Sequence, residues 1–294
     1  MIEVQAEVPV ELLDLLEEHF CEEVRSPWCI VRITPTSPAL LSGYFEDQTS
    51  GLEAWDDLRL SFPAIAARPE VTPVADADWK LAYRSHLTYW NSGPLHWVPV
   101  WERETTGIPS GDTAIYLDSG MAFGTGSHQT TRLCALAILQ WLHDHPEANL
   151  QHQTLIDVGC GSGILALSAR GLGFGQVFGF DRDPESVRIS LENARENNLL
   201  TGVEFAQGGI EDWLPERKAI VVVANIQADV LRLYAEDLLA AVLPGGTLIL
   251  SGILSSENGK VVQAFQTAAG ARLHQPAESA FDGDWSSVVL KNLG

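Results

Sequence analysis

Short apolar segments alternate with stretches of helical apolar spacing from residue 154 to the end of the chain. Strands are expected over 154–159, 176–181, 203–209, 219–226 and 247–254, and helices over 163–173, 184–198 and 228–243. Nearly continuous apolar strands that alternate with helices indicate a parallel sheet covered on both faces. After a further helix, residues 271–278 and 285–292 are expected to close the sheet as an antiparallel pair. The pattern predicts an α/β protein with a doubly wound, mostly parallel, seven-stranded sheet.

The first 76 residues show a different, shorter rhythm. Strands are expected over 2–8, 28–34, 39–47 and 70–76, and helices over 10–20 and 51–60. The order β-α-β-β-α-β predicts a small α+β domain of the ferredoxin-like type.

A connecting helix follows, which Asp78 can cap and which ends near Gly93. The strands 95–101 and 113–120 and a helix over 128–145 complete the prediction. We therefore expect an N-terminal domain over 1–76, a linker helix over 77–93 and a catalytic domain over 94–294.

The composition is that of a globular protein, with 294 residues of which 46% are apolar. The start of the chain lacks the basic and apolar regions of a signal peptide, and no apolar run reaches the length of about 20 residues that spans a bilayer. The four cysteines, Cys21, Cys29, Cys134 and Cys160, are scattered and form no CxxC pair. We expect a reduced, cytoplasmic protein without membrane contact.

The net charge of −21 argues against direct binding of nucleic acid, because a binder of phosphates carries a basic surface. Residues 1–76 hold 15 Asp or Glu and 4 Lys or Arg. This segment can attract a basic protein partner, or its acidity can simply maintain solubility.

Three glycines within five positions follow the strand at 154–159, in the sequence DVGCGSGIL. Gly159, Gly161 and Gly163 add no packing, so a ligand is expected to approach the main chain here. A tight turn that needs glycine for its geometry alone is the alternative. In a doubly wound sheet, ligands bind at the carboxyl ends of the strands, where this loop lies.

The spacing of these glycines favours one class of nucleotide cofactor over another. Dinucleotide sites use G-x-G-x-x-G, whereas this loop has G-x-G-x-G and begins with Asp157. A carboxylate there repels a pyrophosphate but suits a ligand with an amino group and a sulfonium. Asp181, at the end of the next strand, can accept hydrogen bonds from both ribose hydroxyls. S-adenosylmethionine is therefore preferred to NAD.

Four motifs in order carry a family resemblance. LDSGMAFGTGSHQTT at 117–131, DVGCGSG, VVVANI at 221–226 and LILSGIL at 248–254 together resemble the ribosomal protein L11 methyltransferase family, of the class I S-adenosylmethionine-dependent methyltransferases. The resemblance spans residues 76–294. It departs from the family pattern at Ser119 and Gln129, where proline is usual, and at Ser127, where threonine is usual.

The resemblance implies a set of cofactor-binding residues. They are Thr131, Gly159, Asp181 and Asn225, with Phe123, Gly124, Thr125, Gly126, Asp157, Gly161 and Ile210 as further members. Residues 123–126 can form a loop that closes over the cofactor, and Ile210 can pack on its adenine ring. Asn225 is expected to orient the amine that accepts the methyl group.

Several of these side chains also have structural interpretations. Asp181 can instead cap the following helix, and Thr131 can merely begin its own. His128 is attractive as a base, but a capping role is favoured. His143, His145 and His152 lie in a connector that is expected to be exposed, so no metal site is expected.

The resemblance also implies a function. We expect a protein methyltransferase that modifies lysine or N-terminal amines of a large-subunit ribosomal protein, L11, which the N-terminal domain recognises. A methyltransferase of the same fold acting on another protein or a small amine is the alternative. A cofactor-binding module without catalysis is a third interpretation. We expect a monomer.

Overall fold

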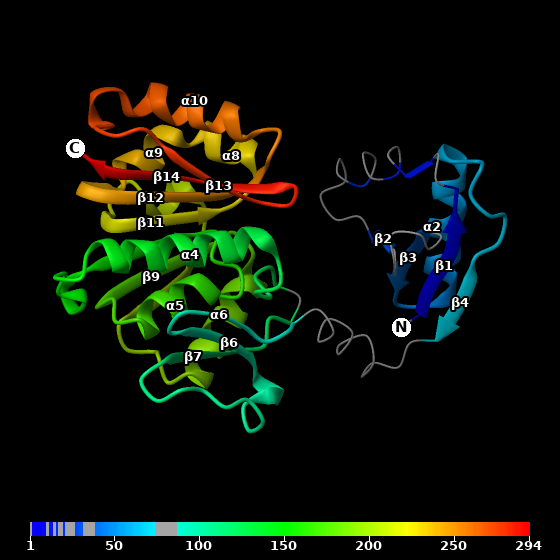
Figure 1. The fold of residues 1–294 in the computed structure, drawn as a ribbon. Helices are drawn as coiled ribbons and strands as arrows, with labels where there is room; N and C mark the ends of the chain where they lie inside the picture. The colour runs from blue at the N-terminus through cyan, green and yellow to red at the C-terminus, as the bar shows by residue number, and fades with distance from the viewer. Residues whose placement is uncertain are drawn as a thin grey trace. The chain divides into compact units, whose positions relative to one another are not determined.

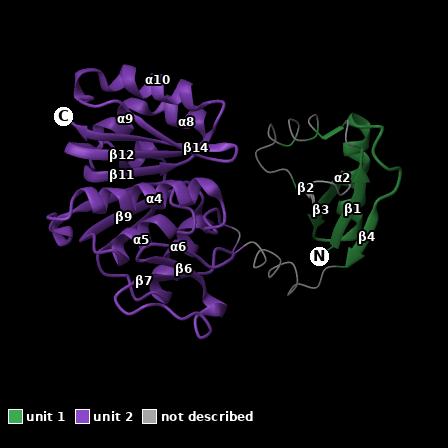
Figure 2. Cartoon of the chain, viewed as in Figure 1, with its two compact units in different colours: residues 1–82 green, residues 83–294 purple. Residues whose placement is uncertain are grey.

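The computed structural model describes residues 2–9, 12–13, 16, 20, 27–31, 39–73, 87–120 and 122–294. The chain divides into two compact units, residues 1–82 and 83–294 (Figure 2). No helix in these described ranges is long and apolar enough to cross a membrane.

The first unit is built on a four-stranded antiparallel sheet. Its strands are β1 (Ile2–Val8), β2 (Trp28–Val31), β3 (Ala39–Phe45) and β4 (Glu70–Pro73), in the order β2-β3-β1-β4. Helix α2 (Gln48–Ser61) begins where Asp47 accepts a hydrogen bond from the Ser50 amide at 2.9 Å, and it buries Trp55 against the sheet. This arrangement agrees with the α+β prediction. Most of the helix expected over 10–20 lies outside the described residues.

The prediction of a linker helix over 77–93 is wrong at its C-terminal end. Residues 74–86 lie outside the described part, but Trp90–Ser92 forms strand β5, which pairs antiparallel with β6 (Leu95–Pro99). Gly93, at φ +50°, makes the turn between them, and the Trp90 and Trp97 rings pack at 4.3 Å. A cross-strand aromatic pair thus overrides the helical spacing of this segment. Strand β6 continues in parallel with β7 (Thr113–Leu117).

The second unit contains the predicted seven-stranded sheet, in the order β10-β9-β8-β11-β12-β14-β13 (Figure 1). The bounds are β8 Thr154–Val158, β9 Gln176–Asp181, β10 Val203–Gln207, β11 Ala219–Asn225, β12 Val242–Leu254, β13 Glu278–Asp282 and β14 Trp285–Leu293. Strands β8 to β12 are parallel, and β14 runs antiparallel to β12 and β13. The doubly wound, mostly parallel prediction is confirmed.

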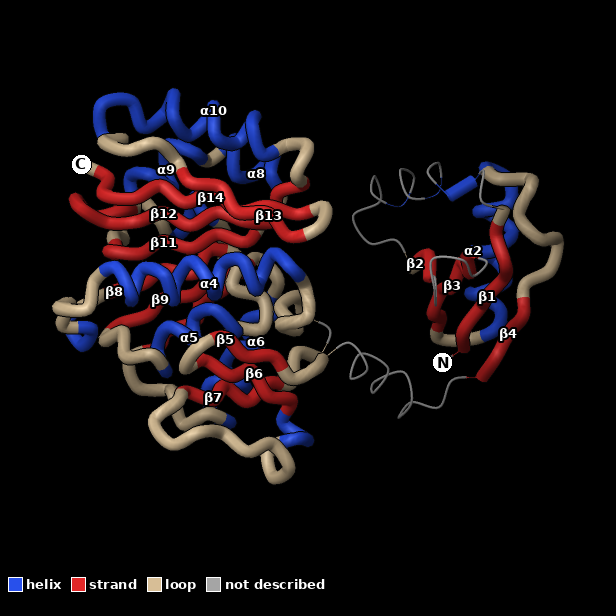
Figure 3. Tube along the Cα trace, viewed as in Figure 1, coloured by secondary structure: helices blue, strands red, loops and turns tan. Residues whose placement is uncertain are grey.

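Helices cover both faces of this sheet (Figure 3). They are α4 Gln129–Asp144, α5 Ile164–Gly171, α6 Pro184–Glu196, α7 Ile210–Trp213, α8 Ala228–Leu233, α9 Ala235–Ala240 and α10 Asn258–Ala269, with 3-10 turns at Val100–Glu102, Leu150–His152 and Gly270–Arg272. Successive strand residues point to opposite faces. Leu155 therefore packs in the core beneath α4 and α5, and its neighbour Ile156 packs in the core beneath α8 to α10.

Two predicted boundaries near the C-terminus are wrong. The helix expected over 228–243 breaks at Tyr234, and Val242 already belongs to β12, where it pairs with Ala219. The pairing register between β11 and β12 shifts here, and this shift accommodates Pro244 and the glycines that follow it, as a bulge does. The strand expected over 271–278 is instead Glu278–Asp282, which forms a hairpin with β14.

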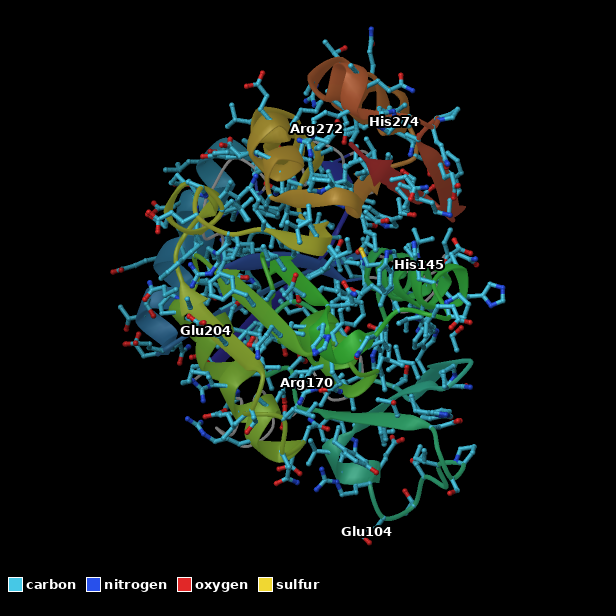
Figure 4. The ribbon with its side chains drawn as sticks, turned by 90° about the vertical axis from the view of Figure 1, so that its left-hand side faces the viewer. Glu104, His145, Arg170, Glu204, Arg272 and His274 are labelled. Carbon is cyan, nitrogen blue, oxygen red and sulfur yellow. The ribbon has the colours of Figure 1, made fainter. Side chains whose placement is uncertain are left out.

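Two arginines lie at the edge of the sheet where the parallel strands begin, and both donate hydrogen bonds to main-chain carbonyls there (Figure 4). Arg170 donates hydrogen bonds to the carbonyls of Thr201 and Phe174, ahead of β10 and β9. Arg272 donates to the carbonyls of Leu239 and Gly294. The opposite edge, where the parallel strands end, is the edge that carries ligands in this architecture.

Candidate active site

A pocket of about 340 Å³ lies where β8, β9 and β11 end. Its size is within the usual range for a small-molecule site. Six of the predicted residues line it: Phe123, Gly159, Gly161, Asp181, Ile210 and Asn225. Among the residues that the structure describes, the lining does not include Gly124, Thr125, Gly126, Thr131 or Asp157.

The glycine loop between β8 and α5 agrees with both interpretations of its sequence, a tight turn and a main chain that a ligand can approach. Gly159 has φ +69° and Gly161 has φ +53°, a region that side chains disfavour. A Cβ on Gly159 would lie 2.5 Å from Cγ2 of Ile226, and one on Gly161 would clash with the carbonyl of Phe123. The glycines are thus needed for the turn and its packing, and they also present bare main chain to the pocket.

Asp181 ends β9 with its carboxylate at the glycine loop. Oδ2 accepts a hydrogen bond from the Gly161 amide at 3.0 Å, and Oδ1 accepts one from the Asp183 amide at 2.9 Å. The residue that caps α6 is Asp183, which accepts from the Glu185 amide, so the capping alternative for Asp181 is wrong. A carboxylate has about four acceptor positions, and two therefore remain for ribose hydroxyls.

Asn225 ends β11 on the other side of the glycine loop. Its Nδ2 donates to Oγ1 of Thr131 at 3.3 Å, which fixes the orientation of the amide. Its Oδ1 is buried and accepts no hydrogen bond from the described residues. A buried acceptor without a donor is costly, so this oxygen fits a ligand that brings a donor into the pocket.

Asp157 lies behind the glycine loop rather than in the pocket wall. Its side chain is 1% exposed, and Oδ2 accepts a hydrogen bond from the Ala166 amide at 3.0 Å, in the first turn of α5. Burial raises the pKa of Asp157 to about 7, against the lowering effect of that hydrogen bond. The predicted contact between Asp157 and a ligand amino group therefore remains a prediction.

The segment 122–128 is bound to the glycine loop by hydrogen bonds. The Ser162 amide donates to the Phe123 carbonyl at 2.8 Å, and Oγ of Ser162 donates to the Gly124 carbonyl at 2.6 Å. Gly126 packs against Trp97, and Thr125 contacts Ser127. Phe123, which is 53% exposed, is the member of this segment that reaches the pocket.

His128 is the N-cap of α4, as its capping interpretation predicts. Its Nδ1 accepts a hydrogen bond from the Thr130 amide at 3.3 Å. Nδ1 also lies 2.7 Å from Oγ1 of Thr130, and His128 is not among the residues that line the pocket. Burial lowers the pKa of His128, which favours its neutral form.

Sequence reasoning missed a second group of lining residues. They are Val158, Phe180, Arg182, Gly208, Gly209, Ile226, Gln227, Val230 and Tyr234. The pair Gly208 and Gly209 at the end of β10 was a usable signal, and so was Arg182, directly after Asp181. Val230 lies on α8 and Tyr234 at the break before α9, where their spacing resembles that of any core residue.

No group of three histidine, cysteine or acidic side chains suited to a metal ion occurs in the described ranges. His145, one of the three histidines considered from the sequence, stacks on Trp141, and its Nδ1 lies 2.8 Å from the Trp141 carbonyl oxygen.

Comparison with known proteins places the chain in a family. The family model described as ribosomal protein L11 methyltransferase matches residues 21–292. The chain is 36% identical to the ribosomal protein L11 methyltransferase of Geobacter sulfurreducens, over 99% of this chain and 98% of the relative. It is 33% identical to that of Deinococcus radiodurans, over 84% of this chain and 89% of the relative.

A solved structure supports the same assignment. The crystal structure of the ribosomal protein L11 methylase of Lactobacillus delbrueckii subsp. bulgaricus is 29% identical and has a TM-score of 0.58, covering 70% of this chain and 99% of that one. The resemblance stated from the sequence motifs is thus confirmed, and the chain belongs to the ribosomal protein L11 methyltransferase family.

Proposed function

We propose that this protein transfers methyl groups from S-adenosylmethionine to lysine or N-terminal amines of ribosomal protein L11. Membership of the family supports this function, and relatives of nearly full length carry that name. The observation in the site that carries the proposal is Oδ1 of Asn225, a buried acceptor at the pocket with no donor among the described residues.

The pocket residues fit the proposed cofactor. Asp181 retains free acceptor positions for ribose hydroxyls, and Gly159 and Gly161 allow the methionine part to approach the main chain. Phe180 and Ile210 offer an apolar surface to the adenine ring. When bound, S-adenosylmethionine supplies a methyl group on a positively charged sulfur, and this sulfur leaves as an amine attacks the methyl carbon in line.

The protein's own contribution to the reaction is positioning and the removal of water. A lysine amine must be neutral to attack, and its transfer into a desolvated pocket lowers its pKa. Oδ1 of Asn225 accepts a hydrogen bond from the neutral amine. The lone pair of the amine nitrogen can then point along the reaction axis. Because His128 caps α4 and is not among the residues that line the pocket, the amine releases its proton to water before the transfer.

The first unit is proposed to recognise the protein substrate. Residues 1–76 carry 15 acidic and 4 basic side chains, and a ribosomal protein that binds RNA is basic. We further propose that the enzyme works as a monomer in the cytoplasm and binds the free protein without contacting nucleic acid.

The test is methylation of purified L11 by the purified full chain with isotope-labelled S-adenosylmethionine. Label in L11, located by mass spectrometry on amines, is the expected result, and other purified large-subunit proteins serve as the matched controls. Label in another protein or a small amine alone would favour the alternative substrate. Binding of the cofactor by calorimetry without any transfer would favour a binding module and overturn the proposal.

A further inference from the structure

Strand β13 is the outermost strand at one edge of the seven-stranded sheet (Figure 1). It pairs with β14 on one side, and no strand in the described part of the chain pairs with it on the other. All five of its residues are exposed, including Phe281, which is 59% exposed. An uncovered strand edge presents main-chain donors and acceptors, so it can pair with a further strand.

The hairpin shows which main-chain groups of β13 point outward. The turn between β13 and β14 has two residues, so the flanking Asp282 and Trp285 form a hydrogen-bonded pair. Hydrogen-bonded and non-hydrogen-bonded pairs alternate along an antiparallel ladder. The N–H and C=O groups of Phe281 and Ser279 therefore point away from β14, toward the outer edge of the sheet.

Strand β13 ends on the same side of the sheet as the pocket. It runs in the same direction as β12, because β14 is antiparallel to both, so its carboxyl end lies where β8, β9 and β11 end. The turn is held there, since the Ser255 amide, directly after β12, donates to the Asp284 carbonyl at 2.8 Å. The Trp285 ring packs on His128 at 4.8 Å, and His128 packs at 5.5 Å on Phe123, which lines the pocket.

The side chains of β13 are acidic at both ends of the strand. Glu278 and Asp282 lie four positions apart and therefore on the same face. Oε2 of Glu278 lies 3.0 Å from Nζ of Lys291, whereas Asp282 forms no ion pair with the residues that the structure describes. Asp284, in the turn, is exposed as well. The charge of this edge complements that of a basic segment.

The same charges argue against a second copy of the chain as the occupant. If two β13 strands paired antiparallel with full overlap, Glu278 of each copy would lie opposite Asp282 of the other. Like charges directly opposite each other destabilise a strand pair. A basic strand places opposite charges at the same two positions instead.

We propose that an extended, basic segment of the protein substrate pairs with the outer edge of β13 as a further strand of the sheet. The inference rests on the proposed function, and it names a surface of the second unit that holds the substrate. Neighbouring strands are about 4.8 Å apart, so the added strand would lie roughly 19 Å from β11, which Asn225 ends. At about 3.3 Å per residue, a segment that continues for about six residues beyond the edge reaches the end of β11.

The first test measures steady-state methylation of L11 by the full chain. Phe281→Pro removes one outward N–H, and edge strands tolerate proline where the N–H points to solvent. Phe281→Ala is the matched control, because it removes the same ring but keeps the N–H. The KM for L11 is expected to be about 3- to 10-fold higher for the proline variant than for the alanine variant, the range of one hydrogen bond, with equal kcat.

A second pair of variants tests the charge of the edge. Asp282→Lys is expected to raise the KM for L11 about 2- to 5-fold at low salt, with a smaller difference at high salt. Glu216→Lys is the control with the wild-type KM, since Glu216 is exposed just before β11, on the side of the sheet where the parallel strands begin.

Hydrogen exchange followed by NMR measures the pairing directly. The amides of Ser279 and Phe281 are expected to exchange more slowly when L11 is bound. The amide of Ala280, which points toward β14, is the internal control and is expected to change less. Thermal unfolding of each variant is measured alongside, and the exchange in the wild type decides the question if Phe281→Pro unfolds.

Each outcome supports or overturns the inference. A higher KM in Phe281→Pro than in Phe281→Ala, with slower exchange at the two outward amides, supports it. Equal KM values overturn it, and so does unchanged exchange in the presence of L11. A wild-type dimer in light scattering that Phe281→Pro dissociates would assign the edge to a second copy and also overturn it. In these cases the wild type still methylates L11, whereas no methylation by the wild type means that the proposed function itself fails.

Discussion

Two neighbouring parts of the active site have similar sequence signals but different positions. The strand ends of β8, β9 and β11 place Gly159, Asp181 and Asn225 in the pocket wall. The upstream segment 122–131 is also rich in glycine and hydroxyl groups, yet only Phe123 of its described residues lines the pocket. The comparison shows that such signals mark a binding region, whereas the partners of each side chain decide which residue meets the ligand.

A side chain behind the wall is expected to affect stability or the orientation of a wall residue, and one in the wall to affect binding or rate directly. Asp157 and Thr131 are the strongest cases behind the wall, since both are buried and hydrogen-bonded within the protein. Asp181 and Asn225 are their counterparts in the wall. Substitution of these four residues therefore tests whether the pocket wall and the residues behind it have different roles.

The largest effect is expected from Asp157 and concerns pH. Its pKa of about 7 in the folded protein is above the ordinary value of 3.8, so the folded state keeps this proton longer than the unfolded state. The resulting stabilisation is complete below pH 3.8 and is lost as the pH rises through about 7. The free energy of unfolding is therefore expected to fall by up to about 4 kcal/mol from this group across that range.

Asp157→Asn removes this titration. Urea unfolding across the pH range is expected to show a smaller decline for the variant, and exposed Asp229→Asn serves as the control with the wild-type slope. An unchanged slope together with lost cofactor affinity would instead place Asp157 in contact with the ligand.

The next effect is on cofactor binding. Asp181→Ala is expected to weaken binding of S-adenosylmethionine about a hundredfold, because two ribose hydroxyls lose a charged acceptor. Asp183→Ala is the control in the same loop; it removes the cap of α6 and is expected to cost about 1 kcal/mol of stability with little change in affinity. Equal affinities in calorimetry for both variants would contradict the placement of Asp181.

The strand ends could be predicted from the sequence because each has a local cause. Apolar strands followed by glycines, as at Val158 and Gly159, specify both the sheet and the turn at its edge. The hairpin at Trp90 was missed because its stabilising contact with Trp97 is made across a turn, while the helical spacing of the segment is read along the chain. The start of β12 at Val242 was missed for the same reason, since its pairing partner is Ala219.

The candidate site could be predicted only in part. Asp181 and Asn225 stand at strand ends, so their position follows from the topology. Thr131 lies behind Asn225, and the sequence cannot show which of two contacting polar groups is closer to a ligand. Arg182 lines the pocket beside Gly209, which belongs to a loop that follows another strand, so the sequence around Asp181 does not reveal this neighbour.

The third prediction concerns the rate. Asn225→Ala is expected to lower kcat about 30-fold, because the amine loses the acceptor that orients it, while the dissociation constant of the cofactor changes less than about threefold. Asn149→Ala, an exposed asparagine whose side chain makes no capping bond, is the control. A full rate at saturating cofactor would exclude the orienting role of Asn225.

The smallest effect is expected from Thr131, and it separates the two positions most sharply. Thr131→Val keeps the shape but removes the oxygen that accepts from Nδ2 of Asn225. The amide then lacks its partner and turns more freely, so kcat is expected to fall about 3- to 5-fold with an unchanged cofactor dissociation constant. Thr267→Val, at an exposed site on α10, controls for the loss of a threonine hydroxyl. If Thr131→Val instead weakens cofactor binding and leaves kcat unchanged, Thr131 binds the cofactor directly, as the family resemblance implies, and the division between wall and support fails at this residue.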